Sequence, residues 1–133
     1  MQQQLESGKV HAIANSFDLF GGKATYTVAY TSAKFRDRDP KLYQALYNAM
    51  KEATETVRTD IEKASRYWIE DSGSKLSVDF VAKAGSGKGT EWTMIPDRTM
   101  DAAAFMADIG TLKVRPKSWK DYFFPEAYEL PGS

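Results

Sequence analysis

Two patterns of apolar and polar positions dominate the first half of the chain. Between residues 25 and 31 the sequence TYTVAYT alternates, so that Tyr26, Val28 and Tyr30 share one face. Alternation of β-branched and aromatic residues predicts a half-buried β-strand. From residue 40 the spacing becomes helical, and the apolar stripe consists of Leu42, Leu46, Ala49, Met50, Ala53 and Val57. We expect this strand and this helix to form the hydrophobic centre of the fold.

Polar residues and glycines set the boundaries of these two elements. Gly21 and Gly22 predict a turn before the strand, because residues without a Cβ adopt positive φ at little steric cost. Asp39 is a suitable N-cap for the long helix, and Pro40 suits its first position.

Shorter helices are predicted in the second half. Asp60 is expected to cap a helix that ends at Gly73, with an apolar stripe of Ile61, Ala64, Tyr67 and Trp68. Ser77 is expected to cap the next helix, and Thr99 a fourth one with Gly110 just beyond its end. The expected apolar side of the fourth helix consists of Ala102, Phe105, Met106 and Ile109.

The C-terminal region carries a cluster of aromatic residues. Residues 118–121 (SWKD) fit a capping box that begins a final turn. The aromatic residues of that turn are Trp119, Tyr122, Phe123 and Phe124. Core packing is favoured over a partner surface for this cluster, because aromatic side chains dominate core burial. The last nine residues, PEAYELPGS, have the composition of a tail.

The fold class expected from these patterns is α/β and rich in helix. It has about four helices and two or three short strands, with the weaker strand patterns at residues 10–15 and 91–95. No internal repeat or linker divides residues 1–133, which we interpret as one domain. Two short strands do not make a stable sheet by themselves. We therefore expect residues 1–133 to be part of a larger fold.

Composition narrows the classes of function. Eighteen basic residues balance eighteen acidic ones, so the positive excess typical of nucleic-acid-binding proteins is absent. No apolar run is long enough to cross a bilayer, and we expect no membrane insertion. The chain has no cysteine, hence no thiolate nucleophile and no Cys-based metal site. The start, MQQQLESGK, lacks the apolar region of a secretory signal.

The sequence carries no recognisable catalytic motif. The segment AGSGKGT at residues 84–90 invites comparison with a phosphate-binding loop, but the first glycine of that motif would fall at Ala82, and a predicted helix precedes the segment. His11 is the sole histidine and has no second metal ligand at the usual spacing. We predict a protein that is not an enzyme, with no catalytic residues, no metal and no cofactor.

The segment around the glycine turn is the best candidate for ligand contact. Its small polar residues and glycines are Asn15, Ser16, Asp18, Gly21, Gly22 and Thr25. Such a segment can offer backbone N–H groups and hydroxyls to an anionic or polar ligand. A plain connection between two strands explains the same composition equally well.

Several motifs, taken in order, carry a family resemblance. They are NSFDLFGGKATYTVAYTSAKFRDRDPKLYQAL from residue 15, IEDSGSKLSVD from residue 69 and MIPDRTMDAAAFMADIGTLKVRPKSWKDYFFPEAYELPGS from residue 94. The most specific parts are FMADIGTLK at residues 105–113 and KSWKDYFFPE at residues 117–126. Together they resemble the C-terminal part of substrate-binding proteins of bacterial ABC transporters. The branch is the nitrate, sulfonate and taurine type, which includes binders of thiamine precursors.

The resemblance implies a bilobal α/β fold of the periplasmic-binding-protein type, which closes on a small solute in a cleft between lobes. It also implies an ABC permease as partner and a periplasmic location. Family members are longer, and the portion outside the resemblance is the N-terminal one. The segment of residues 15–25 corresponds to the stretch near the cleft, so the resemblance agrees with the candidate ligand-binding residues.

Two alternative functions stay open at this point. In the first, the chain is a non-enzymatic assembly protein that forms a homo-oligomer through Tyr26, Tyr30, Trp119 and Phe123. In the second, it is a small enzyme that holds a nucleotide at residues 84–90. We expect that the chain by itself binds no solute tightly, because a cleft needs two walls.

Overall fold

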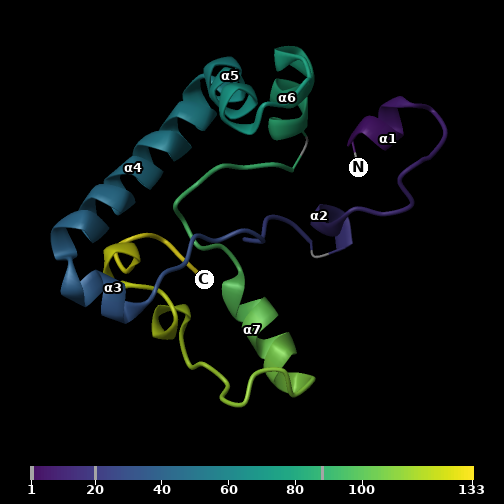
Figure 1. Ribbon diagram of the computed structural model, residues 1–133. Coiled ribbons are helices and arrows are strands. Elements are labelled where there is room, and N and C mark those ends of the chain that lie inside the picture. The colour runs from purple at the N-terminus through teal and green to yellow at the C-terminus, as the bar shows by residue number, and fades with distance from the viewer. Residues whose placement is uncertain (1, 20, 88) are drawn as a thin grey trace. The chain divides into compact units, whose positions relative to one another are not determined.

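The computed structural model describes residues 2–19, 21–87 and 89–133, and this part of the chain is helical (Figure 1). Its α-helices are α1 (Gln2–Glu6), α2 (Ser16–Leu19), α3 (Ala33–Arg38), α4 (Pro40–Thr59), α5 (Ile61–Ser72), α6 (Val78–Gly85) and α7 (Thr99–Asp108). Two 3-10 turns, η1 (Trp119–Asp121) and η2 (Pro125–Ala127), follow α7.

The expected strands do not form within the described residues. Residues 25–31, 10–15 and 91–95 contain no strand, so the helical part of the α/β expectation holds and the strand part does not. Alternation reports which side chains could share a face, whereas a strand also needs a neighbour to complete its hydrogen bonds. Thr25 is hydrogen-bonded to Asp97, and neither residue is assigned to a strand.

The chain divides into two compact units. The first, here called the helical unit, comprises the described residues of 1–15 and 30–93. The second, here called the C-terminal unit, comprises the described residues of 16–29 and 94–133. Each unit is described by itself below.

Local capping fixes the helices of the helical unit. The Asp39 carboxylate accepts from the Leu42 N–H, with Pro40 next to it, as predicted. Asp60 has two roles, because its N–H donates to the Thr56 carbonyl and its carboxylate accepts from the Lys63 N–H. It thereby ends α4 and begins α5.

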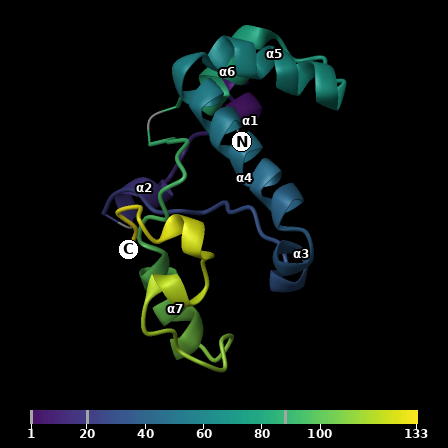
Figure 2. The ribbon, with the colours of Figure 1, turned by 90° about the vertical axis from the view of Figure 1, so that its left-hand side faces the viewer.

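The end of α5 and the start of α6 also follow the prediction. Gly73 is left-handed at φ 64°, and the Ser77 hydroxyl accepts from the Phe80 N–H at 3.2 Å. Helix α5 packs on α4 and on α6 (Figures 1 and 2). Helix α3, which the periodicity did not predict, is capped by Ser32 and packs on α4.

Burial in the helical unit differs from the expected pattern. Tyr43 is only 8% exposed, although it lies outside the predicted stripe of α4, whereas Leu42 is 53% exposed. Leu46 and Met50 of that stripe are exposed as well. Ser65 of α5 is buried and donates its hydroxyl proton to the Ile61 carbonyl. The stripe is thus not the hydrophobic centre in the described residues.

Trp119 lies at the centre of the C-terminal unit. It is buried, and it meets Phe123 and Tyr128 edge-on, at centroid distances of 5.8 and 6.2 Å. The capping box predicted at residues 118–121 is formed. The core interpretation therefore holds for Trp119, while Tyr122 at the edge of the cluster is exposed.

Helix α7 begins differently from the prediction. Thr99 is its first residue rather than its cap, and Arg98 at the N-cap position is left-handed, with φ 53° and no side-chain cap. Gly110 ends the helix in the left-handed conformation, as predicted. The expected apolar side is largely exposed, including Phe105, Met106 and Ile109.

Candidate functional site

The candidate ligand-binding segment begins with one short helix and a turn. Helix α2 starts at Ser16, immediately after Asn15. The N–H of Gly22 donates to the Phe17 carbonyl at 2.8 Å, and the N–H of Gly21 donates to the Asp18 carbonyl at 3.3 Å. Both glycines have positive φ, 70° and 140°, so the predicted need for glycine at this turn is confirmed.

Thr25 is fixed to a residue far along the chain. Its N–H donates to the Asp97 carbonyl at 2.8 Å, and its hydroxyl oxygen accepts from the Asp97 N–H, also at 2.8 Å. These two bonds close a ring between residues 72 positions apart. Thr25 is half-buried as a result.

The C-terminal residues extend this connection to α7. Ser133 accepts from the Arg98 N–H through its hydroxyl at 2.9 Å, and its backbone oxygen accepts from the Thr99 N–H at 2.8 Å. The Thr99 hydroxyl donates to the same oxygen, and the Ser133 N–H donates to the Pro96 carbonyl. We call residues 96–99 with 132–133 the C-terminal clasp.

The clasp corrects the sequence interpretation at two points. Residues 132 and 133 are not a free tail, and the orphan N–H groups at the start of α7 are satisfied by Ser133 instead of a local cap. Sequence reasoning missed the roles of Asp97 and Ser133 because the partners of each lie more than 30 positions away along the chain. The sequence offered one indication of a distant partner. No Ser, Asn or Asp stands at the N-cap position of α7 to accept from the N–H groups of Arg98 and Thr99.

The segment contains residues of differing exposure. Asn15, Ser16 and Asp18 are exposed, and Gly22 is half-buried like Thr25. Open space surrounds the turn, since a Cβ built at Gly21 or Gly22 would meet no atom within 4 Å. The backbone of the turn is therefore accessible to a ligand.

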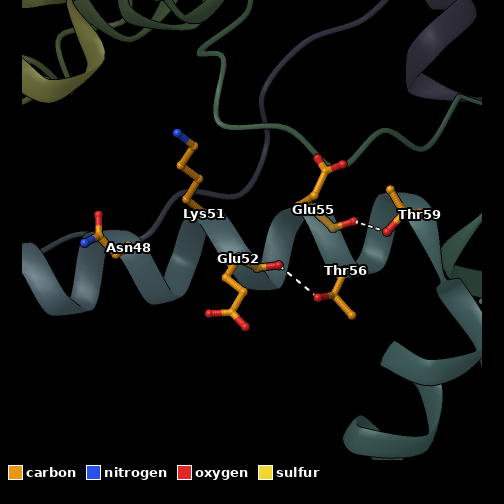
Figure 3. Close-up of a pocket in the computed structure, with 6 residues that line it drawn as sticks. All are labelled: Asn48, Lys51, Glu52, Glu55, Thr56 and Thr59. Carbon is orange, nitrogen blue, oxygen red and sulfur yellow. Dashed lines mark hydrogen bonds between the residues drawn. The ribbon is translucent and has the colours of Figure 1, made fainter.

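A separate hollow of about 390 Å³ lies along α4 (Figure 3). All six of its lining residues belong to that helix: Asn48, Lys51, Glu52, Glu55, Thr56 and Thr59. None of them was predicted to bind a ligand. The hollow is open to solvent along the helix surface, which is not the enclosed form of a small-molecule site.

Several polar groups of this hollow are engaged within the helix. The hydroxyls of Thr56 and Thr59 donate to the carbonyls of Glu52 and Glu55, at 3.0 and 2.8 Å. The Glu55 carboxylate accepts two bonds from Arg58, and this hydrogen bonding raises the pKa of the Arg58 guanidinium above its ordinary value. The arrangement is that of a solvated helix face.

The glycine-rich segment follows a helix, as predicted, and not a strand. Helix α6 ends at Gly85, the Thr90 N–H donates to the Gly87 carbonyl, and α7 begins only at Thr99. Lys88, the lysine that a nucleotide site would use, lies outside the described residues. A phosphate-binding loop joins a strand to a helix, so the described parts of this segment have a different context.

The described part of the chain shows neither a metal-binding cluster nor a membrane-spanning helix. It contains no cluster of three His, Cys, Asp or Glu side chains arranged to hold a metal ion. None of its helices combines the length and apolar character that a bilayer crossing requires.

Comparison with family models, with curated proteins and with solved structures gave no match in any of the three searches.

Proposed function

We propose that this chain is the C-terminal part of a solute-binding component of an ABC importer. Its solute is a small anionic or heterocyclic molecule such as a sulfonate, nitrate or a thiamine precursor. Outside the cytoplasmic membrane, the protein binds this solute and delivers it to the permease, and it catalyses no reaction. The fold we propose for the whole binding protein is bilobal.

The observation that carries the proposal is the ring between Thr25 and Asp97. Thr25 belongs to the motif GGKATYT and Asp97 to MIPDR, two of the ordered motifs behind the family resemblance. They bond to one another through two hydrogen bonds of 2.8 Å. Motifs that are distant in the sequence thus meet beside the segment proposed to contact the solute.

The chemistry of that segment suits a polar or anionic solute. The Thr25 oxygen accepts from Asp97, while a hydroxyl group also has a proton to donate. The turn at Gly21 and Gly22 leaves its backbone open to approach. The N–H groups of Gly21 and Gly22 already donate within the turn, so the hydroxyls of the segment are its donors for sulfonate or nitrate oxygens.

The chain exposes more surface than two compact domains of the same total mass would, which supports the proposal that it is only part of a binding protein. The protein exposes 10373 Å². Two separate globular domains, each of half its mass, would expose only about 8400 Å² in total. Large apolar side chains such as Ile13 and Leu19 contribute to the exposed surface. A further lobe would cover such surface and supply the second wall of a cleft.

A chimera tests the proposal. This chain replaces the corresponding C-terminal part of a taurine-binding member of the family, and taurine binding is measured by calorimetry. We expect a folded chimera that binds taurine, with affinity reduced at least tenfold by Thr25→Val, which removes the hydroxyl and keeps the side-chain size.

The matched control is Thr27→Val, two residues further along the same segment. It is expected to leave taurine binding within about twofold of the chimera. A chimera that unfolds cooperatively but gives no heat with taurine would contradict the proposal.

A second candidate, assembly into a homo-oligomer, is favoured by exposed tyrosines. Tyr30 is 94% exposed and Tyr26 is also exposed. Trp119, by contrast, is buried within the C-terminal unit, and Phe123 is half-buried and packs against it, so these two contribute less free surface than the tyrosines. Light scattering during size-exclusion chromatography distinguishes a stable oligomer from a monomer.

A further inference from the structure

Two consecutive peptide groups in front of α7 are each held from both sides. The first joins Pro96 to Asp97, and the second joins Asp97 to Arg98. The carbonyl of the first group accepts from the Ser133 N–H at 2.9 Å, while its N–H donates to the Thr25 hydroxyl oxygen at 2.8 Å. The carbonyl of the second group accepts from the Thr25 N–H at 2.8 Å, while its N–H donates to the Ser133 hydroxyl oxygen at 2.9 Å.

These shared peptide groups connect Ser133 to Thr25 mechanically. A peptide group is planar and rigid, so its carbonyl and its N–H turn together. A hydrogen bond on one side of the plane consequently fixes the direction of the polar group on the other side. Ser133 holds the same two planes that hold Thr25, and all the residues involved belong to the C-terminal unit. The position of Thr25 therefore depends on Ser133.

The Ser133 hydroxyl also supports an uncommon backbone conformation. Arg98 has a φ of 53°, in the left-handed region that residues with a Cβ seldom adopt. Such a conformation persists where the surrounding contacts hold it. The Ser133 hydroxyl accepts from the Arg98 N–H and donates to an Asp97 carboxylate oxygen at 3.4 Å. Without this hydroxyl, we expect the peptide group between Asp97 and Arg98 to rotate more freely and its bond with Thr25 to open more often.

We infer that Ser133 is a positioning residue for Thr25, and that it acts through the two peptide groups around Asp97. The Thr25 hydroxyl oxygen accepts from the Asp97 N–H, so its proton can be directed to a solute oxygen. The clasp then orients this donor, and that consequence for solute binding rests on the function proposed above. The coupling between Ser133 and Thr25 does not rest on it, and is tested in the 133-residue chain itself.

Amide hydrogen exchange, followed by NMR in the full chain, measures the coupling. Ser133→Ala removes the hydroxyl and keeps the backbone N–H and carbonyl of that residue. It is expected to speed exchange of the Thr25 N–H at least fivefold, because that N–H is bonded to the Asp97 carbonyl. Exchange of the Asp121 N–H, which donates to the Ser118 carbonyl outside the clasp, is expected to change less than twofold. Ser133→Thr retains a hydroxyl and is expected to restore slow exchange.

The matched control is Thr111→Ala, which removes an exposed hydroxyl from the same unit outside the clasp. The Thr25 N–H of this variant is expected to exchange at the original rate. Equal exchange of the Thr25 N–H in the original chain and in Ser133→Ala would overturn the inference. Equal acceleration of the Thr25 and Asp121 N–H groups in Ser133→Ala would also overturn it, because the hydroxyl would then stabilise the unit as a whole.

Taurine binding by the chimera tests the consequence for the solute. Ser133→Ala is expected to lower the affinity at least threefold in the chimera, and less than twofold in a chimera that already carries Thr25→Val. Residues that act through one another give such non-additive losses. Equal losses in the two chimeras would overturn the positioning role. A folded chimera that binds no taurine would contradict the proposed function, and the exchange rate of the Thr25 N–H in the 133-residue chain would still decide the inference.

Discussion

Gly132 packs tightly against Pro96 and Trp119 in the C-terminal unit. A Cβ built there lies 2.9 Å from Pro96 Cγ and from two ring atoms of Trp119. Neither a proline ring nor a buried indole yields easily. We therefore expect Gly132→Ala to destabilise this unit by about 1–3 kcal/mol, the usual cost of overpacking. Urea unfolding followed by the signal of Trp119 in 5-fluorotryptophan ¹⁹F NMR measures this change.

Gly87→Ala is the control for that substitution. Its nearest neighbour would be the Lys83 carbonyl oxygen at 3.8 Å, an ordinary contact. The Trp119 transition is expected to stay unchanged in this variant. A Gly132→Ala protein whose Trp119 signal unfolds at the same urea concentration as the original would show that the clasp is loose.

At the scale of elements, Asp60 joins two helices. Its backbone closes α4 and its carboxylate caps α5. We expect Asp60→Ala to lower the stability of the helical unit by about 0.5–2 kcal/mol, the usual cost of losing an N-cap. Asp60→Asn retains an acceptor oxygen and is expected to recover most of the loss. Thermal unfolding by circular dichroism at 222 nm measures both, and equal stability of the Ala and Asn variants would contradict the capping role.

The elements that could be predicted are those fixed by nearby residues. Asp39, Asp60 and Ser77 cap the helices that follow them, and Gly73 ends α5, because each acts within one helical turn. Ser32 provides the same local signal for α3, and the absence of an apolar stripe in that six-residue helix obscured it.

The elements that could not be predicted depend on distant partners. Helix α7 is capped by Ser133, which lies 34 residues beyond Thr99 and cannot be recognised from local sequence. The alternating residues 25–31 have the composition of a strand, but they are not assigned to one in the structure. In the candidate site, the glycine turn was predictable from its composition, whereas the connection from Thr25 to Asp97 was not.

At the scale of the whole molecule, many large apolar side chains lie in contact with water. Leu46 and Met50 on α4, and Phe105 and Ile109 on α7, are examples that their periodicity predicted to be covered. Exposed apolar surface of this extent marks an interaction site. In our account, the remainder of a bilobal binding protein covers part of it and completes the cleft.

The most direct test of this account is a calorimetric titration of taurine into the 133-residue chain and into the taurine-binding chimera, side by side. We expect micromolar binding by the chimera and no measurable binding by the chain alone. Micromolar binding by the chain alone would contradict the claim that it supplies one wall of the cleft. A folded chimera without binding would contradict the solute-binding role itself.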